Sequence, residues 1–178
     1  MRRRDFVGLI GGAAAWPLAV RAQQRMARIA VLMNVADNLL ERALLTAFRQ
    51  RLKELGWAEG SNVQIDERWA AGESAIMQSH ALELVSLRPD VILVRGNRGL
   101  TAIQNVTRAI PTVFVGLADP IGLGFVESLA RPGGNITGFT IYEVSIVGKL
   151  LEMLKQIAPG VTRVVFMYHP DNLTAHGS

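Results

Sequence analysis

Residues 90–106 of the chain read DVILVRGNRGLTAIQNV. An apolar, β-branched run from Val91 to Val94 stops at Arg95-Gly96, and apolar residues at helical spacing follow from Leu100. The run predicts a buried strand at 90–94, and the later spacing predicts a helix over 100–109. A strand, a short glycine turn and a helix in succession form the repeating unit of a parallel sheet covered by helices.

The same alternation extends along most of the chain. Further apolar runs predict strands at 28–33, 63–65, 112–115, 136–139 and 163–168. Further helices are expected from a cap at Asp37 or Asn38 to Leu55, and at 76–87, 125–130 and 143–157. This order predicts an α/β fold, a doubly wound parallel sheet. We expect its core to include Ile29, Val31, Leu44, Phe48, Leu52, Val91, Leu93, Val113 and Val115.

Ligands of such sheets bind where the strands end and the next helices begin. The predicted edge loops are 34–37, 95–101, 116–120 and 140–143. Residues 96–99, GNRG, precede a helix, so their backbone N–H groups suit a carboxylate or phosphate, although the glycines equally suit a tight turn. Asp119, before Pro120, either caps a helix or faces a ligand amine.

The first 22 residues have the features of an export leader. Arginines at the start precede a short apolar run over 6–20, and small residues flank Arg21. Arg3-Arg4-Asp5-Phe6 matches the core of a twin-arginine signal, with an ordinary secretory signal as the alternative. We expect cleavage after Ala22. A nucleotide-binding glycine loop at 8–12 is disfavoured because no buried strand precedes it.

Composition argues against several classes of function. The chain has a formal net charge of +4, most of which the leader contributes through four arginines against one aspartate. The remainder is nearly neutral, so a basic nucleic-acid-binding domain is not expected. There are no cysteines, and the three histidines have no metal-ligand spacing. We therefore expect no catalytic set, no metal site and no cofactor.

Several segments resemble a known family. They are AFRQRLKELGWAEGSNVQIDERWA (47–70), ADPIGLGFVESLARPGGNITGFT (118–140) and GKLLEMLKQIAPGVTRVVFMYHPDN (148–172), together with the leader. The chain resembles ABC-transporter substrate-binding proteins of the periplasmic-binding type I fold, in the tryptophan/tyrosine-binding-like subgroup. The 118–140 segment is distinctive, whereas the alternating pattern alone is not.

The resemblance implies a two-lobed protein that traps a small amino-acid-like or carboxylate ligand between its lobes. Residues 23–141 match the first lobe, and 142–178 match a crossover helix and the first strand of a second lobe. The chain is therefore expected to be a truncated form with impaired binding. Arg95 and Arg98 are departures from the family pattern that favour a more acidic ligand. The ligand-binding residues implied by position are Asn34, Asn97, Gly99, Ala118, Asp119 and Thr140.

The same resemblance implies a periplasmic location, a membrane ABC permease as partner, and the twin-arginine translocase as partner during export. Two alternatives stay open. One is a cytoplasmic Rossmann-like enzyme, for which an intact Met1 is expected. The other is a periplasmic sensor domain with the same fold. A mature N-terminus at Gln23 favours an exported protein over the enzyme.

Changing both Arg3 and Arg4 to Lys is expected to keep the chain in the cytoplasm, because the paired arginines are the feature that the translocase receptor reads. Cell fractionation and immunoblotting of the two forms measure this. Periplasmic delivery of the Lys variant at the unaltered level would exclude the twin-arginine route.

Overall fold

The computed structural model describes residues 26–142 and 145–165, so the predicted leader lies outside the described residues. Five strands form one parallel sheet in the order β2-β1-β3-β4-β5. The strands are β1 (Ala27–Met33), β2 (Val63–Trp69), β3 (Val91–Arg95), β4 (Thr112–Ala118) and β5 (Ile136–Tyr142). Each strand corresponds to one of the predicted apolar runs.

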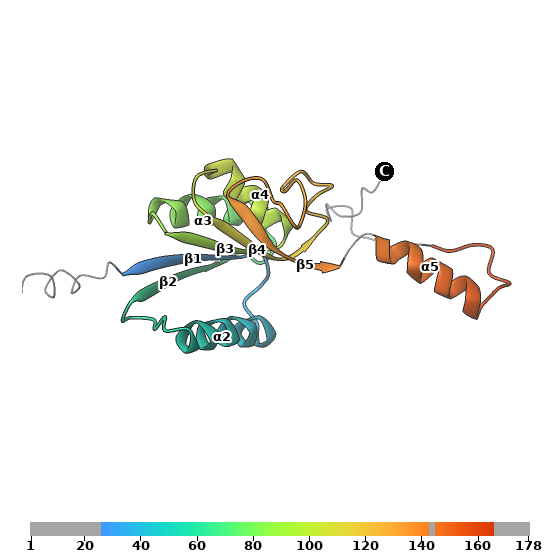
Figure 1. Cartoon of the computed structure of the whole chain (residues 1–178), viewed down its shortest axis with the longest axis horizontal. Helices are drawn as coiled ribbons and strands as arrows, with labels where there is room; N and C mark the ends of the chain where they lie inside the picture. The colour runs from blue at the N-terminus through green and yellow to red at the C-terminus, as the bar shows by residue number, and fades with distance from the viewer. Residues whose placement is uncertain (1–25, 143–144, 166–178) are drawn as a thin grey trace, which may run out of the picture.

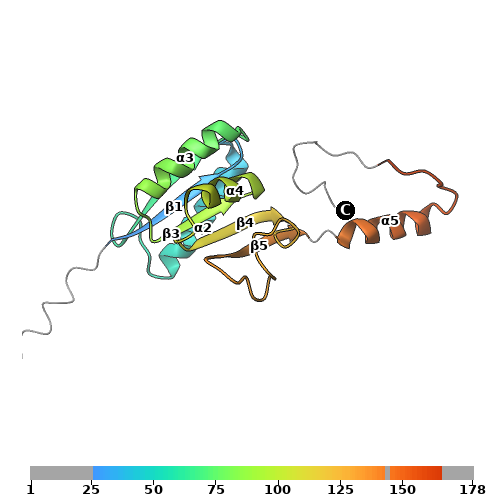
Figure 2. The ribbon, with the colours of Figure 1, turned by 90° about the horizontal axis from the view of Figure 1, so that it is seen from above.

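Helices cover both faces of this sheet, as the parallel arrangement requires. They are α2 (Leu39–Glu54), α3 (Ser74–Ser86), α4 (Asn97–Val106) and α5 (Ser145–Ile157). Helices α3 and α4 lie on one face and α2 on the other, while α5 projects beyond the end of β5 (Figures 1 and 2). The predicted doubly wound α/β fold is confirmed. None of the helices within the described ranges is long and apolar enough to cross a bilayer.

One predicted element is wrong, and another is described only in part. Residues 125–130 form no helix, because the backbone N–H of Glu127 bonds forward to Pro132 O at 3.2 Å and Gly124 takes a φ of 70°. So short a segment gains little from helical hydrogen bonds, and the turn chemistry decides its path. Residues 163–165, the described part of the sixth predicted strand, lie outside any strand, and 166–168 lie outside the described residues.

The helix starts are set by local capping. Asn38, rather than Asp37, caps α2, since its Oδ1 accepts the Glu41 N–H at 3.1 Å. Helix α4 begins at Asn97, three residues before its predicted start, so Gly99 lies inside the first turn. Moving the start of α4 to the end of β3 places its first turn at the carboxyl edge of the sheet.

The deepest part of the core lies between the sheet and helices α3 and α4. The side chains there that are 0–1 % exposed include Ile92, Val94, Leu100, Ile103 and Phe114. Gly138 of β5 lies opposite Phe114 in the register. A Cβ atom at this glycine would lie 2.6 Å from Phe114 Cγ, so the residue must be glycine if the ring is to lie against β5.

The predicted core residues belong mostly to the opposite face, which is less completely covered. Ile29 and Val31 are buried, but Leu44 is 51 % exposed, so its assignment to the core is wrong. Two residues of α2 and four of the sheet are partly buried: Phe48, Leu52, Val91, Leu93, Val113 and Val115.

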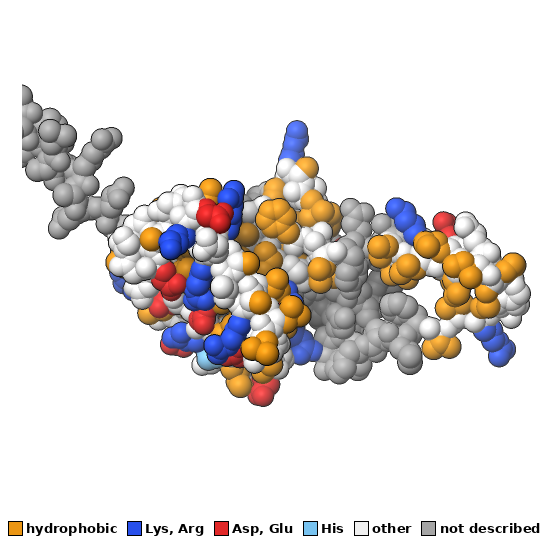
Figure 3. Space-filling view, turned by 90° about the horizontal axis from the view of Figure 1, so that it is seen from below, with side chains coloured by type: hydrophobic (Ala, Val, Ile, Leu, Met, Phe, Trp, Pro, Cys, Tyr) orange, Lys and Arg blue, Asp and Glu red, His pale blue; other side chains and the backbone are white. Residues whose placement is uncertain are grey.

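The incomplete cover of this face leaves a hollow of about 270 Å³ between α2 and the sheet, with Leu44 and Leu93 in its lining. On β5, Phe139 and Ile141 are 73 % and 66 % exposed. Hydrophobic side chains accordingly gather on this side of the molecule (Figure 3). The α2 face therefore contributes less buried apolar surface than the α3/α4 face.

Replacing Phe114 by Ala is expected to lower the free energy of unfolding by about 3–5 kcal/mol, because a fully buried aromatic ring leaves a cavity. Urea denaturation followed by circular dichroism measures the loss. Leu40→Ala is the control: Leu40 is 68 % exposed, and its change is expected to stay within about 0.5 kcal/mol. Equal effects of the two substitutions would contradict the assigned core.

Candidate functional site: the carboxyl edge of the sheet

The ends of β1 and β3 touch through an asparagine and a glycine. Asn34 follows β1, and its side-chain amide lies directly against Gly96, the residue after β3. A Cβ atom on Gly96 would lie 2.5 Å from Asn34 Cγ, and this glycine has a φ of 80°. Both facts require glycine at this position. Asn34 is partly exposed, so its amide lines the edge rather than the core.

The ends of β3 and β4 are joined through Asn97. Its Oδ1 accepts the Ala118 N–H at 3.3 Å, and its Nδ2 donates to Ala118 O at 3.2 Å. The amide thus replaces a pair of sheet hydrogen bonds at the point where β4 ends. Sequence reasoning placed Asn97 at the edge. The structure shows that its side chain fastens the edge together.

The first turn of α4 faces the same edge. Gly96 occupies the cap position without a side chain, and the first N–H groups of a helix have no acceptor within the helix. These groups carry the positive end of the helix dipole, which favours an anionic group. Gly99 is buried in this turn, and a Cβ atom there would lie 2.8 Å from Val94 Cγ2. The turn therefore suits a carboxylate.

The last two predicted site residues lie at the ends of β4 and β5. Thr140 is the register partner of Leu117, one residue before Ala118. Asp119 adopts a φ of 48°, and its Oδ1 accepts the Gly122 N–H at 2.9 Å. Of the two expectations for Asp119, capping is favoured, but it closes a turn and not a helix. Asn34, Asn97, Gly99, Ala118 and Thr140 are brought to one edge, and their ligand contacts stay a prediction.

Arg95 is paired with a carboxylate that sequence reasoning missed. Arg95 Nη2 lies 2.7 Å from Glu41 Oε1, and Glu41 is 5 % exposed in the first turn of α2. The available signal was a glutamate three residues after the cap Asn38, a spacing that places it at the start of the helix. Because Glu41 offsets the charge of Arg95, the expectation that Arg95 favours an acidic ligand is not supported.

The other charges at this edge are also engaged. Arg98 Nη1 donates to Gly72 O at 3.1 Å. Arg42 forms hydrogen bonds to both carboxylate oxygens of Asp37, in the loop after β1. This guanidinium lowers the pKa of the Asp37 carboxyl below its usual value. The edge thus offers backbone N–H groups, amides and hydroxyls more than unpaired charge.

An open parallel sheet with helices on both faces and polar loops at one carboxyl edge defines the lobe of a ligand-binding protein or of a nucleotide-binding enzyme. Comparison with known proteins decides between them. Residues 28–176 match the family described as ABC transporter substrate binding protein. The chain belongs to this family, which is the one that its sequence resembles.

Individual relatives agree with this assignment. The tyrosine-binding protein of Clostridioides difficile (strain R20291) is 30 % identical over 128 residues, which are 72 % of this chain and 36 % of that protein. A conserved domain protein from Vibrio cholerae has 30 % identity and a TM-score of 0.72, covering 85 % of this chain and 50 % of that one.

A third similar structure, an ABC domain from Streptococcus pneumonia in complex with L-Trp, has 24 % identity and a TM-score of 0.64. It covers 76 % of this chain and 44 % of its own, and at this identity it supports the fold. The chain thus spans half or less of the length of these relatives. The ligands named for these proteins are properties of those proteins.

Asn97→Ala is expected to lower the free energy of unfolding by about 1–3 kcal/mol, because both backbone groups of the nearly buried Ala118 lose their partners. Urea denaturation measures the change. Asn105→Ala, an exposed asparagine on the same helix, is the matched control and is expected to be nearly neutral. A neutral Asn97→Ala would contradict the fastening role.

Proposed function

We propose that the chain is the solute-binding component of an ABC importer and that it captures a small amino-acid-like or carboxylate ligand at the carboxyl edge of its sheet. Membership of the substrate-binding family supports the transport role. The single observation that carries the site is the joining of three strand ends by Asn34, Gly96 and Asn97 around the first turn of α4.

In this proposal the ligand carboxylate lies at the N-terminus of α4. The N–H groups of the first turn, which have no acceptor within the helix, donate to it, and the helix dipole adds a favourable field. Asn34 contributes an amide beside Gly96, and Thr140 contributes a hydroxyl from the neighbouring strand end. Asp119 is less suited to a ligand amine than the sequence suggested, since its carboxylate already accepts a backbone N–H.

The remaining parts of the proposal concern the whole protein. Ligand capture is completed when a second lobe closes over this edge, which is the hinge motion described for such proteins. The loaded protein then meets a permease in the inner membrane. Export through the twin-arginine route to the periplasm rests on the leader sequence, which lies outside the described residues.

Tyrosine is the first ligand to test, because the relative from Clostridioides difficile is named as tyrosine-binding. Calorimetric titration with L-tyrosine is compared with tyramine, which lacks the carboxylate. Tyrosine is expected to bind at least about tenfold more tightly, because a hydrogen bond to a charged group is worth on the order of 1.5–3 kcal/mol.

The Asn34→Ala variant is expected to weaken tyrosine binding, whereas Asn105→Ala, which changes an exposed asparagine further along α4, is expected to leave it unaltered. Equal binding of tyrosine and tyramine would reject the carboxylate site. Binding of another class of small molecule in preference to amino acids and aromatic acids would reject the proposed ligand class.

A further inference from the structure

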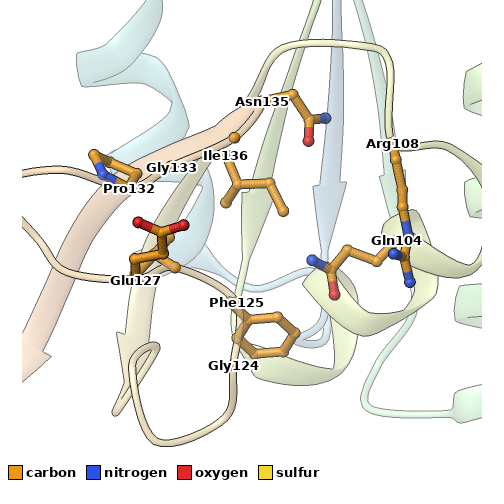
Figure 4. A pocket seen from close by; sticks show the side chains of 11 residues that line it. Gln104, Arg108, Gly124, Phe125, Glu127, Pro132, Gly133, Asn135 and Ile136 are labelled. Carbon is orange, nitrogen blue, oxygen red and sulfur yellow. The ribbon is translucent and has the colours of Figure 1, made fainter.

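A second hollow lies away from the carboxyl edge. It has a volume of about 400 Å³ and lies between the end of α4 and residues 124–136 (Figure 4). Ile136 in its lining is the first residue of β5, so the hollow belongs to the amino ends of the strands. The proposed ligand residues follow the carboxyl ends. This is therefore a separate place, of a size within the range of about 300–1,000 Å³ typical for small-molecule sites.

The middle of this hollow is apolar. Phe125 packs against the core as a partly buried residue, and Ile136 is 6 % exposed. Figure 4 shows these two side chains between the charged side chains of the lining. An apolar floor of this kind suits a short hydrocarbon segment, which gains free energy by leaving water.

Opposite charges lie on opposite sides of the floor. Glu127 is on one side, and Gln104 and Arg108 are on the other (Figure 4). Among the described residues, neither Glu127 nor Arg108 has a side-chain ion pair or hydrogen bond, although both are charged and line one hollow. Within the same described ranges, the Gln104 side-chain amide likewise has no hydrogen bond to the protein. Both charges are thus available to a ligand.

The backbone around the hollow makes room for Glu127 and fixes Asn135. Gly133 has a φ of 83°, and a Cβ atom there would lie 2.6 Å from Glu127 Cδ, so the glycine leaves room for the carboxylate. The Glu127 N–H bonds to Pro132 O at 3.2 Å. Asn135 Nδ2 donates to Ile110 O at 2.7 Å, which fixes the wall and leaves Oδ1 as an acceptor. Much of the distinctive 118–140 segment thus lines this hollow, whereas few of its residues lie at the carboxyl edge.

We propose that this hollow binds a dipolar molecule whose ammonium and carboxylate groups are separated by an apolar chain, such as an ω-amino acid. The ammonium faces Glu127, the carboxylate faces Arg108, and the chain crosses Phe125 and Ile136. An α-amino acid with an uncharged side chain carries its ammonium and carboxylate groups on one carbon, so it does not span the apolar floor between the two charges. The site lies away from the carboxyl edge and does not depend on the function proposed there.

The test is an NMR titration of the full ¹⁵N-labelled chain with 6-aminohexanoate, hexanoate, hexylamine and alanine. Binding of 6-aminohexanoate in the millimolar range is expected for a ligand of about nine non-hydrogen atoms. Shifts are expected at the amides of Gln104, Phe125 and Asn135. Hexanoate and hexylamine, which each lack one charge, are expected to bind roughly three- to tenfold more weakly. Alanine is expected to leave these amides unmoved.

Three exposed-charge variants assign the ends of the ligand. Arg108→Gln is expected to weaken 6-aminohexanoate binding to the level of hexylamine, while hexylamine binding stays unaltered. Glu127→Gln is expected to weaken both. Arg131→Gln removes an exposed arginine of the same loop that does not line the hollow, so it is the matched control. All three change exposed side chains and are expected to fold.

Equal affinities for 6-aminohexanoate and hexylamine would show a simple cation site at Glu127 and overturn the proposal. Shifts confined to other parts of the chain, or none at tens of millimolar ligand, would overturn it too. An Arg131→Gln effect as large as that of Arg108→Gln would show a general charge effect and would equally reject the site. None of these outcomes bears on tyrosine binding, so the two proposals fail separately.

Discussion

Parallel pairing places the carboxyl ends of all five strands at one edge of the sheet, and the arrangement of the polar residues depends on it. Each loop at that edge comes from a different part of the sequence, so contacts must hold the loops in register. Asn97 does this between β3 and β4, and Asn34 fits against Gly96 between β1 and β3. Without a fixed edge, the first turn of α4 would have no defined neighbours.

The sequence predicts the strands well because their signal is local. A run such as Val91–Val94 is buried on one face and partly buried on the other, and its β-branched residues favour a strand. The edge residues follow from the strands by geometry alone. The sequence does not predict how closely a helix packs on the sheet. The apolar spacing of α2 correctly indicates which side of the helix faces the sheet, but it does not give the distance between them, and Leu44 is half exposed.

Two other features escaped prediction for distinct physical reasons. The Arg95–Glu41 pair joins residues 54 positions apart, and nothing in either local segment identifies the partner. The segment 125–130 has helix-forming residues, but a helix of this length is not stable on its own, and the Glu127 N–H bonds to Pro132 O in the following turn instead. The segment lines a hollow together with Gly133 because the tertiary fold brings this turn beside α4, which no local pattern indicates.

The unequal covering of the two sheet faces has a consequence for how the lobe opens. Helix α2 lies over a hollow and exposes Leu40 and Leu44, whereas the α3/α4 side is closed around Phe114. Local opening is easier where less apolar surface is buried, so we expect the amide protons of α2 to exchange with solvent earlier than those of β3 and β4. The lobe is therefore expected to open from the α2 side first, while the strand ends joined by Asn97 belong to the part that stays folded longest.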